Sequence, residues 1–488
     1  MIDVQVNIHD KFSVEFKIGF ITNQNPKDIN EFRINTWMFV PNSLDINRAT
    51  YSKGLFYKDV KTNIRLITPV YTLEEILKEG RGPLPRLQKS IDALLADPTD
   101  AVKTESYSYQ VKMLMCIVKS ALRRDLQLMF TKTEEEDCVA AVIQYIQSVR
   151  DIAAQYRAKW NILNSNKDIT QQQKEYFLFG DDFLGNIIEQ YTFEIMRHWR
   201  KEPFFDKIKP LLNKLLNEEI QYKKERGFSL LEKGNEEHNS LVIIQRNILK
   251  KFVESDLFLQ VVKKKDGYFA EQFYYSIAAG VAMIFATVIS FFATQRYGNF
   301  TTDLFIVLVV SYMMKDRIKD LMRYYYTSEL SRKYYDTKLK LSIRKQEIGW
   351  LKEAFDFIEE NKLPDAVRNL RNRTPLYEAE NEIYDEKIIL YRKRVNLSRE
   401  DIEKNKEYRL SGINDITRFN LFHFVQKMDN PSLPLFVADE TNGYTSFEGI
   451  RVYSLYFILK CESDSDTYYK KYRILFNREG ITDVKELD

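Results

Sequence analysis

Cysteine, histidine, glycine and proline are all scarce in this sequence. Its 488 residues include three cysteines (Cys116, Cys138 and Cys461) and four histidines, and neither set forms a closely spaced cluster. A disulfide framework or a zinc ribbon needs paired ligands at short spacing, so neither is indicated. The 16 glycines and 12 prolines are few for this length, and we find no internal repeat, low-complexity tract or long linker.

The local motifs of common enzymes are absent as well. The chain has no Walker-type loop, no dinucleotide fingerprint, no His-Glu-x-x-His, no nucleophile elbow and no kinase signature. Glu194 and His198 share a helical face downstream of Asp181 and Asp182, which fits a metal site or, far more commonly, a surface ion pair. His423 fits a packed core position. We predict no catalytic residue, no bound metal and no cofactor; enzymatic activity stays open, and the missing motifs favour a non-enzymatic protein.

A marked excess of charge of one sign is also missing. Lys and Arg total 73 against 70 Asp and Glu, which gives a formal net charge of +3. A nucleic-acid binder usually has a basic excess, so we expect no nucleic-acid partner. Hydrophobic residues make up 44% of the chain and aromatic residues 14%, a composition that supports packed cores and excludes general disorder.

Two long apolar segments in mid-chain predict a transmembrane hairpin. The 24 residues from Gln272 to Gln295 carry no formal charge, and as a helix they cover the hydrocarbon core of about 30 Å. The second segment, Tyr297 to Met314, contains Asp303 and is marginal in length. We expect it to cross the membrane, with a re-entrant or interfacial segment as the alternative.

Basic residues flank both predicted spans, whereas the loop between them holds only Arg296. By the positive-inside rule the loop faces outward, both termini are cytoplasmic, and the protein is a two-span membrane protein. Each basic side chain near an anionic leaflet contributes about 1 kcal/mol of attraction, which makes a bilayer with anionic headgroups the expected partner. The residues predicted to lie at the membrane interface are Lys263, Lys264, Lys265, Lys315, Arg317, Lys319 and Arg323.

Small side chains recur every four residues along the first predicted span. A stripe of this kind lets another helix approach closely, either the second span of the same hairpin or a second copy of the chain. The residues of the predicted packing stripe are Ala278, Ala282, Ala286, Ser290 and Thr294.

The remaining segments alternate between strand and helix patterns. Period-two alternation predicts strands near both ends of the chain, including a hairpin around Glu462 to Asp466 and a tight turn at Asn442-Gly443. Thr72 and Glu75 fit a capping box that opens a helical region. Apolar residues at helical spacing then continue to about Val262, and a further helix is expected over 315–360.

These patterns predict an α+β multidomain membrane protein with five segments. An N-terminal β sheet and a C-terminal antiparallel β domain flank a helical middle, which carries a two-helix transmembrane hairpin and stalk. The expected segments are an N-terminal β domain (1–71), a helical cytoplasmic domain with the first stalk helix (72–266), the hairpin (267–314), a second stalk helix and connector (315–375) and a C-terminal β-rich domain (376–488).

Three functions are compatible with this organisation. The first is a membrane-anchored cytoplasmic binding or scaffold protein, which would place a partner- or ligand-binding event at the membrane. The alternatives are an oligomeric channel or membrane-disrupting effector gated by the soluble domains, and a membrane-tethered enzyme with an unrecognised site. We expect a homo-oligomer or a protein partner. The usage of Lys, Asn and Tyr suggests a bacterial source and hence an inner membrane.

Overall fold

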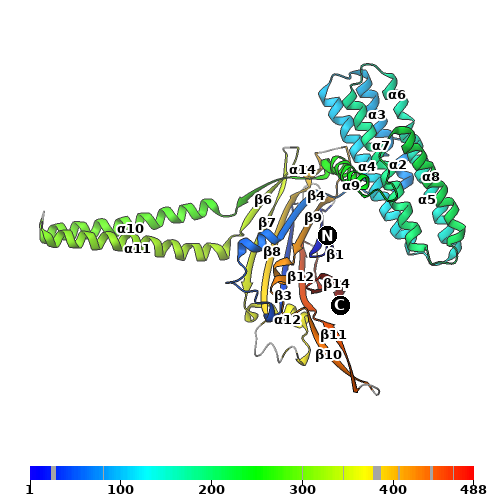
Figure 1. The fold of residues 1–488 in the computed structure, drawn as a ribbon. Helices are drawn as coiled ribbons and strands as arrows, with labels where there is room; N and C mark the ends of the chain where they lie inside the picture. Colours follow the sequence, from blue (N-terminus) through cyan, green and yellow to red (C-terminus); the bar gives the residue numbers. More distant parts are fainter. Residues whose placement is uncertain are drawn as a thin grey trace. The chain divides into compact units, whose positions relative to one another are not determined.

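The chain folds into two compact units (Figure 1). The computed structural model describes residues 1–23, 29–80, 82–298, 301–344, 346–376, 378, 386–404, 407–439, 443–464 and 466–487. The first unit, here called the β unit, comprises Met1–Arg65, Leu259–Lys406 and Gly412–Asp488. The second, the helical unit, comprises Leu66–Phe258 and Glu407–Ser411.

β sheets form the body of the β unit. The first sheet has the order β1 (Ile2–Ile8), β2 (Ser13–Ile21), β9 (Gly412–Asn420), β4 (Val60–Leu66). The second has the order β14 (Gly480–Leu487), β13 (Thr467–Asn477), β12 (Tyr453–Ser463), β3 (Ile29–Val40), β8 (Lys387–Ser398), β7 (Gln346–Ile358), β6 (Thr337–Ile343), β5 (Gln260–Lys265). A separate ribbon pairs β10 (Ser432–Asp439) with β11 (Gly443–Ile450).

Strands from the two ends of the chain are neighbours in these sheets. β2 pairs with β9, and β3 lies between β8 and β12. Across the two sheets, the rings of Phe16 and Phe457 are 5.3 Å apart. The structure is α+β with an N-terminal sheet, a helical middle and a C-terminal antiparallel sheet, but the expected boundaries at 71 and 376 separate strands that belong to one unit.

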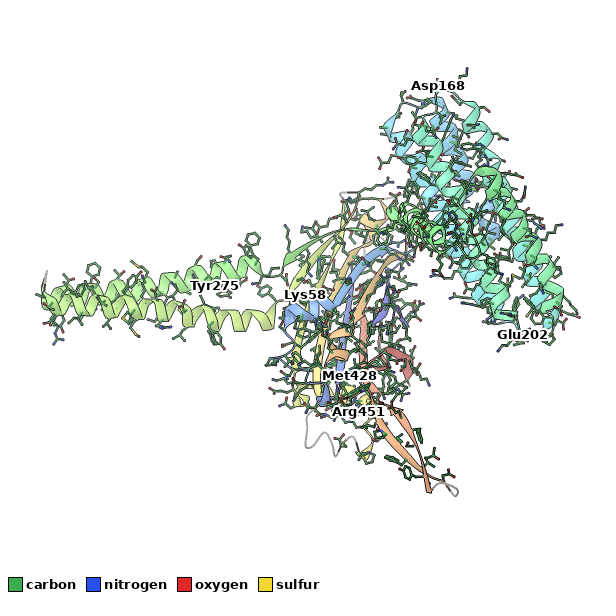
Figure 2. All side chains as sticks on the ribbon, in the orientation of Figure 1. Lys58, Asp168, Glu202, Tyr275, Met428 and Arg451 are labelled. Atoms are coloured by element: carbon green, nitrogen blue, oxygen red, sulfur yellow. The ribbon has the colours of Figure 1, made fainter. Side chains whose placement is uncertain are left out.

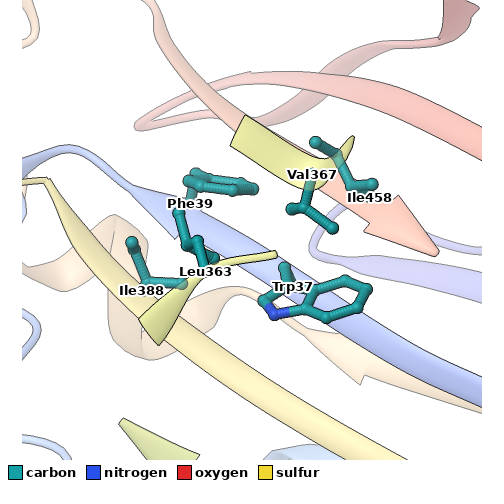
Figure 3. Packing of buried hydrophobic residues seen from close by; sticks show 6 residues of the cluster. All are labelled: Trp37, Phe39, Leu363, Val367, Ile388 and Ile458. Atoms are coloured by element: carbon teal, nitrogen blue, oxygen red, sulfur yellow. The ribbon is translucent and has the colours of Figure 1, made fainter. Parts of the chain in front are cut away.

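The central strand β3 is buried on both faces, because its side chains alternate in direction. Ile34, Thr36 and Met38 line the space between the two sheets. Trp37 and Phe39 point the other way, into a core completed by the helix α12 (Asp365–Arg371) and its preceding turn. Figure 3 shows this core, which consists of Trp37, Phe39, Leu363, Val367, Ile388 and Ile458.

Of the strands and turns predicted in the C-terminal part of the chain, one hairpin is confirmed and one strand is shorter than predicted. The predicted hairpin is present as β12 and β13, joined around Glu462 to Asp466. The alternation of apolar residues over Arg418–Val425 also predicts a strand, but β9 ends at Asn420 and the prediction is wrong beyond it. Asn420 accepts a hydrogen bond from the backbone N–H of Phe422 at 2.8 Å, a local turn that starts the short helix α15 (Phe422–Gln426). The predicted turn at Asn442-Gly443 falls partly outside the described residues.

The helical unit is a bundle of amphipathic helices. As predicted, a capping box of Thr72 and Glu75 opens its first helix. The longest helix, α4, packs against α3, α7 and α9. The helices are α2 (Leu73–Leu77), α3 (Pro83–Ala96), α4 (Ala101–Phe130), α5 (Glu135–Arg157), α6 (Lys159–Ser165), α7 (Gln171–Trp199), α8 (Phe205–Arg226) and α9 (Glu236–Glu254).

The β unit also carries a long helical hairpin of α10 (Tyr268–Tyr297) and α11 (Thr302–Lys333). The predicted helix over 315–360 ends at Lys333, and β6 and β7 follow it. The predicted first stalk helix is also wrong, since α9 ends at Glu254 and the chain continues as strand β5. Because Val261, Val262 and the alternating leucines of β6 favour a strand, an antiparallel β5–β6 pair replaces the two-helix stalk.

Candidate functional site

Helix α10 is apolar and lies on the surface. Among the described residues it is the one helix long and apolar enough to cross a membrane, and only 17% of its apolar stretch is buried. Phe273, Ile284 and Phe291 are each at least 65% exposed. In Figure 2 the hairpin, with Tyr275 near its base, extends away from the strands of the β unit. A core helix would be covered, so this exposed apolar surface needs a different partner.

Helix α11 is less apolar and more highly charged than α10. Its start carries the predicted second span. At 32 residues α11 is long enough to cross a membrane, but it does not meet the hydropathy and low charge expected of a span, so a second crossing remains a prediction. The helices run antiparallel: the Tyr274 ring stacks on Tyr326 at 4.9 Å, and the Arg323 guanidinium lies over the Tyr275 ring at 5.3 Å. The charged part of α11 therefore lies beside the apolar part of α10.

The predicted packing stripe is divided between two surfaces. Ala278 and Ala282 are buried against α11, together with Ala293, which the prediction did not include. Ala286, Ser290 and Thr294 instead line an open groove of about 510 Å³ between the helices. The reason is geometric, because steps of four residues advance 400° around a helix of 3.6 residues per turn, and the stripe rotates away from α11.

Several polar side chains line the groove between α10 and α11. Thr287, Ser290 and Thr294 line its α10 side, and Ser311, Tyr312 and Lys315 line its α11 side. Ser311 is 4% exposed, and its hydroxyl has no hydrogen-bond partner among the described residues.

The predicted basic residues fall into two groups. The first group is on the edge strand β5: Lys265 pairs with Glu271 at 2.5 Å, and the Lys263 ammonium lies 5.0 Å from the ring centre of Tyr57. The second group is on α11, where Lys315 lies over the Tyr312 ring at 3.8 Å and Lys319 pairs with Asp316 at 3.2 Å. Arg317 and Arg323 belong to this second group. The structure does not bring the two groups together in one cluster.

Two aspartates join the hairpin to the β unit. Asp336, just after α11, accepts hydrogen bonds from Lys53 at 2.6 Å and from the Tyr57 hydroxyl at 3.0 Å. Burial, together with the negative charge of Asp336, raises the pKa of Tyr57, so its hydroxyl remains a donor. Asp266, just before α10, accepts a hydrogen bond from Lys352 at 2.9 Å. Both ends of the hairpin are thus fixed by charge-assisted hydrogen bonds.

The histidine and acidic pattern of α7 forms no metal site. The His198 ring stacks on Phe130 at 3.9 Å, and Asp181 accepts hydrogen bonds from Arg157 at 3.0 Å and from Tyr222 at 2.5 Å. No group of three metal-ligating side chains occurs in the described part of the chain. Cys116, Cys138 and Cys461 are buried, and these three described residues form no disulfide.

Sequence reasoning missed two polar networks in the β unit. His423 is not a core residue, since its side chain is 38% exposed and its Nδ1 lies 2.8 Å from Asp59. Lys393 is buried between the sheets with Asp415 and Glu353. The alternation of β8 could have revealed the buried position of Lys393. Every second residue of the strand points inward, and Lys393 falls in the same alternating set as the inward-pointing apolar residues. A cavity beside Lys393 measures about 40 Å³, room for a few water molecules at most.

Comparisons of this chain with protein-family models, with curated proteins and with solved structures find no match.

Proposed function

We propose that this chain is a membrane-anchored binding or scaffold protein. In this proposal the hairpin of α10 and α11 enters a lipid bilayer and holds the β unit and the helical unit at the membrane surface. The observation that supports it is the exposed apolar surface of α10. A helix of 30 residues is about 45 Å long, more than the hydrocarbon core of about 30 Å.

The proposed orientation follows from the basic residues. The lysines of β5 lie at the sheet end of the hairpin, and the cations of α11 extend from its middle, at Lys315, toward that end. The tip carries only Arg296 and Asp303. By the positive-inside rule, the sheet end and both termini face the cytoplasm. If the source is bacterial, this is the inner membrane.

An oligomeric channel or membrane-disrupting effector is the second candidate. It is favoured by the position of Lys315, which lines the same groove as Met283 and Thr287 in the middle of α10. If α10 spans fully, Lys315 lies within the hydrocarbon core, where a lipid-exposed charge costs about 3 kcal/mol or more. A second hairpin over the groove would shield Lys315 from lipid and complete a polar interior.

Insertion of α10 is tested by a pair of matched double variants. Ile284→Arg with Val288→Arg places two charges on the exposed face of α10, at a combined cost of about 5 kcal/mol for insertion. We expect this variant to move from the carbonate-resistant membrane fraction to the soluble fraction. The control, Ile244→Arg with Ile248→Arg, changes exposed isoleucines at the same spacing on α9 and should remain in the membrane. Wild-type protein that carbonate extracts completely would refute the anchor.

Ion flux separates the anchor from the channel. Wild-type protein in liposomes is compared with Lys315→Gln by the fluorescence change of an ion indicator trapped inside. A channel predicts flux that changes in the variant, whereas an anchor predicts no flux above that of empty liposomes from either protein.

A further inference from the structure

The outer face of the eight-stranded sheet carries a row of five cations, here called the cation row. Lys264 on β5 lies directly opposite Lys338 on β6, which in turn lies opposite Lys352 on β7. The row continues through Arg394 on β8 to Arg33 on β3. Since residues directly opposite each other project from the same face of a sheet, all five side chains share one face. Neighbouring strands are about 4.8 Å apart, so the row is about 19 Å long.

This face points away from the core between the two sheets. The residues that flank Arg394 along β8, Lys393 and Val395, are buried, and strand side chains alternate in direction. Arg394 and Arg33 keep 36% and 55% of their side-chain surface exposed, and Lys264 is exposed as well. The cation row is therefore open on the surface of the β unit.

The charge of the cation row is only partly balanced. Glu31 accepts hydrogen bonds from both arginines of the row, at 2.7 Å from each, and Asp266 pairs with Lys352 at 2.9 Å. In the part of the chain that the structure describes, no ion pair involves Lys264 or Lys338. Like charges directly opposite each other destabilise a sheet, so the row retains an excess of positive charge that an anionic ligand would offset.

Aromatic rings lie on both sides of the cation row. Trp350 is two residues before Lys352 on β7, and three charged groups of the row lie 5.4, 5.2 and 5.9 Å from its ring centre, those of Lys338, Lys352 and Arg394. On the other side of the row, the Arg392 guanidinium lies 5.5 Å from the ring centre of Tyr335. The face thus combines a line of cations with planar rings.

A line of cations beside aromatic rings is the arrangement by which proteins bind single-stranded nucleic acids. The cations follow the phosphates, and the aromatic side chains stack bases with little regard to sequence. Open sheet faces bind RNA in this way. A lipid surface or an acidic peptide also supplies negative charge, but neither supplies planar bases to stack on Trp350. The expectation of no nucleic-acid partner came from the net charge of +3, an average over the whole chain that conceals a local row.

We propose that the outer face of this sheet binds single-stranded nucleic acid, with phosphates on the cation row and a base stacked on Trp350. Lys264 and Lys338 supply the cations that the described carboxylates leave unbalanced. The row is long enough for a short segment of about four nucleotides, the lower end of the range that OB-fold sheets bind. Binding at this face does not require insertion of the hairpin, so the inference is independent of the proposed membrane anchor.

The test measures the binding of a fluorescein-labelled oligo(dT) to the full chain in neutral detergent by fluorescence anisotropy. Lys264→Gln with Lys338→Gln should raise the Kd by about tenfold or more. It should also reduce the slope of log affinity against log salt by about 1.4, because each phosphate contact on a single strand contributes about 0.7. Trp350→Leu should raise the Kd by about tenfold, through loss of one stacked base, whereas Trp350→Phe keeps a ring and should bind more tightly than Trp350→Leu.

Stability and a charge-matched control separate a ligand site from a structural role. Because Lys264 and Lys338 face like charges, replacing both should leave the thermal unfolding midpoint unchanged or raise it. The control, Lys61→Gln with Lys209→Gln, removes the same charge from exposed positions on β4 and α8 and should leave the Kd within about twofold. Equal losses of binding in the two double variants, or a lower midpoint in the Lys264→Gln, Lys338→Gln protein, would overturn the proposal.

Two further probes test other anionic partners of the same face. Dioctanoyl phosphatidylglycerol represents a lipid surface, and an oligo-glutamate peptide represents an acidic protein. We expect both to bind more weakly than oligo(dT) and to be insensitive to Trp350→Leu. Absence of oligo(dT) binding refutes the inference. If the lipid or the peptide binds more tightly than oligo(dT), and loss of Lys264 and Lys338 abolishes that binding, the face belongs to that partner and the nucleic-acid assignment is wrong.

Discussion

Lys393 lies inside the β unit with only 3% of its side chain exposed. Its ammonium contacts Asp415, donates to the Thr417 hydroxyl at 2.6 Å and lies 3.6 Å from Glu353. Two carboxylates thus share one buried cation. Burial raises the pKa of Asp415 above its ordinary value, although Lys393 acts in the opposite direction. Such a cluster is sensitive to the loss of any one charge.

Replacement of this cation should be costly at neutral pH and above. Lys393→Met keeps most of the side-chain volume but leaves Asp415 and Glu353 buried without an ammonium. We expect a loss of about 3–5 kcal/mol in the unfolding free energy, measured from denaturant unfolding of the full chain in detergent at pH 8. A variant as stable as the wild type would show that the two carboxylates need no cation.

The same variant should recover stability as the pH falls. Without Lys393 the pKa of Asp415 rises further, so the folded state binds a proton that the unfolded chain releases. Stability then increases as pH decreases from the folded pKa toward the unfolded one. We expect the loss to be smaller at pH 5.5 than at pH 8, whereas the Lys393→Met, Asp415→Asn double variant should show a weaker pH dependence in the same unfolding experiment.

At the scale of helices and strands, the sequence correctly predicted the features that depend on a few adjacent residues. The Thr72 capping box and the turn around Glu462 to Asp466 depend on a few adjacent residues, and both are present. The segment over 337–358 was expected to continue the helix because the chain has no glycine before Gly349 and no proline before Pro364 in this region. It forms strands since its partners, β5 and β8, are distant in sequence, and tertiary pairing outweighs local propensity.

The division of the small-residue stripe gives a prediction for the hairpin. Ala282 is 1% exposed and faces α11, so Ala282→Leu should separate the helices and lower the thermal unfolding midpoint at every protein concentration. Ala286 lines the open groove, so Ala286→Leu should leave the midpoint unchanged. If copies of the chain associate through this groove, as the channel proposal requires, crosslinking across a dilution series should show weaker association in this variant. Ala279→Leu, on the exposed face, is the control. Equal effects of all three substitutions would contradict the assigned faces.

At the scale of the whole molecule, sequence patterns located the charges but not the sites that they form. Lys263, Lys264 and Lys265 were recognised as a basic run beside an apolar segment. One of them, Lys264, belongs to the cation row, which strands from distant parts of the chain complete with Lys338, Lys352, Arg394 and Arg33. No spacing rule relates these positions, because the pairing of five strands brings them together.

The division into two units predicts which fragments fold. Residues 66–258 contain nearly all of the helical unit and lack only the short segment Glu407–Ser411, which contributes the buried Tyr408. The Tyr408 hydroxyl donates to Gln110 at 2.7 Å, so the fragment loses one packed aromatic side chain, at a cost of about 3–5 kcal/mol. We expect it to remain helical by circular dichroism and to unfold cooperatively at a lower temperature than the helical unit of the full chain.

The N-terminal strands should behave in the opposite way. In residues 1–71 alone, β2 lacks β9, β3 lacks β8 and β12, and Phe16 lacks Phe457. Pairing of β1 with β2 would remain, but a two-stranded hairpin is marginal in water without a covered apolar face. We therefore expect an unfolded fragment, with narrow amide proton dispersion by NMR. A cooperatively folded 1–71 fragment would show that the β unit consists of two independent domains after all.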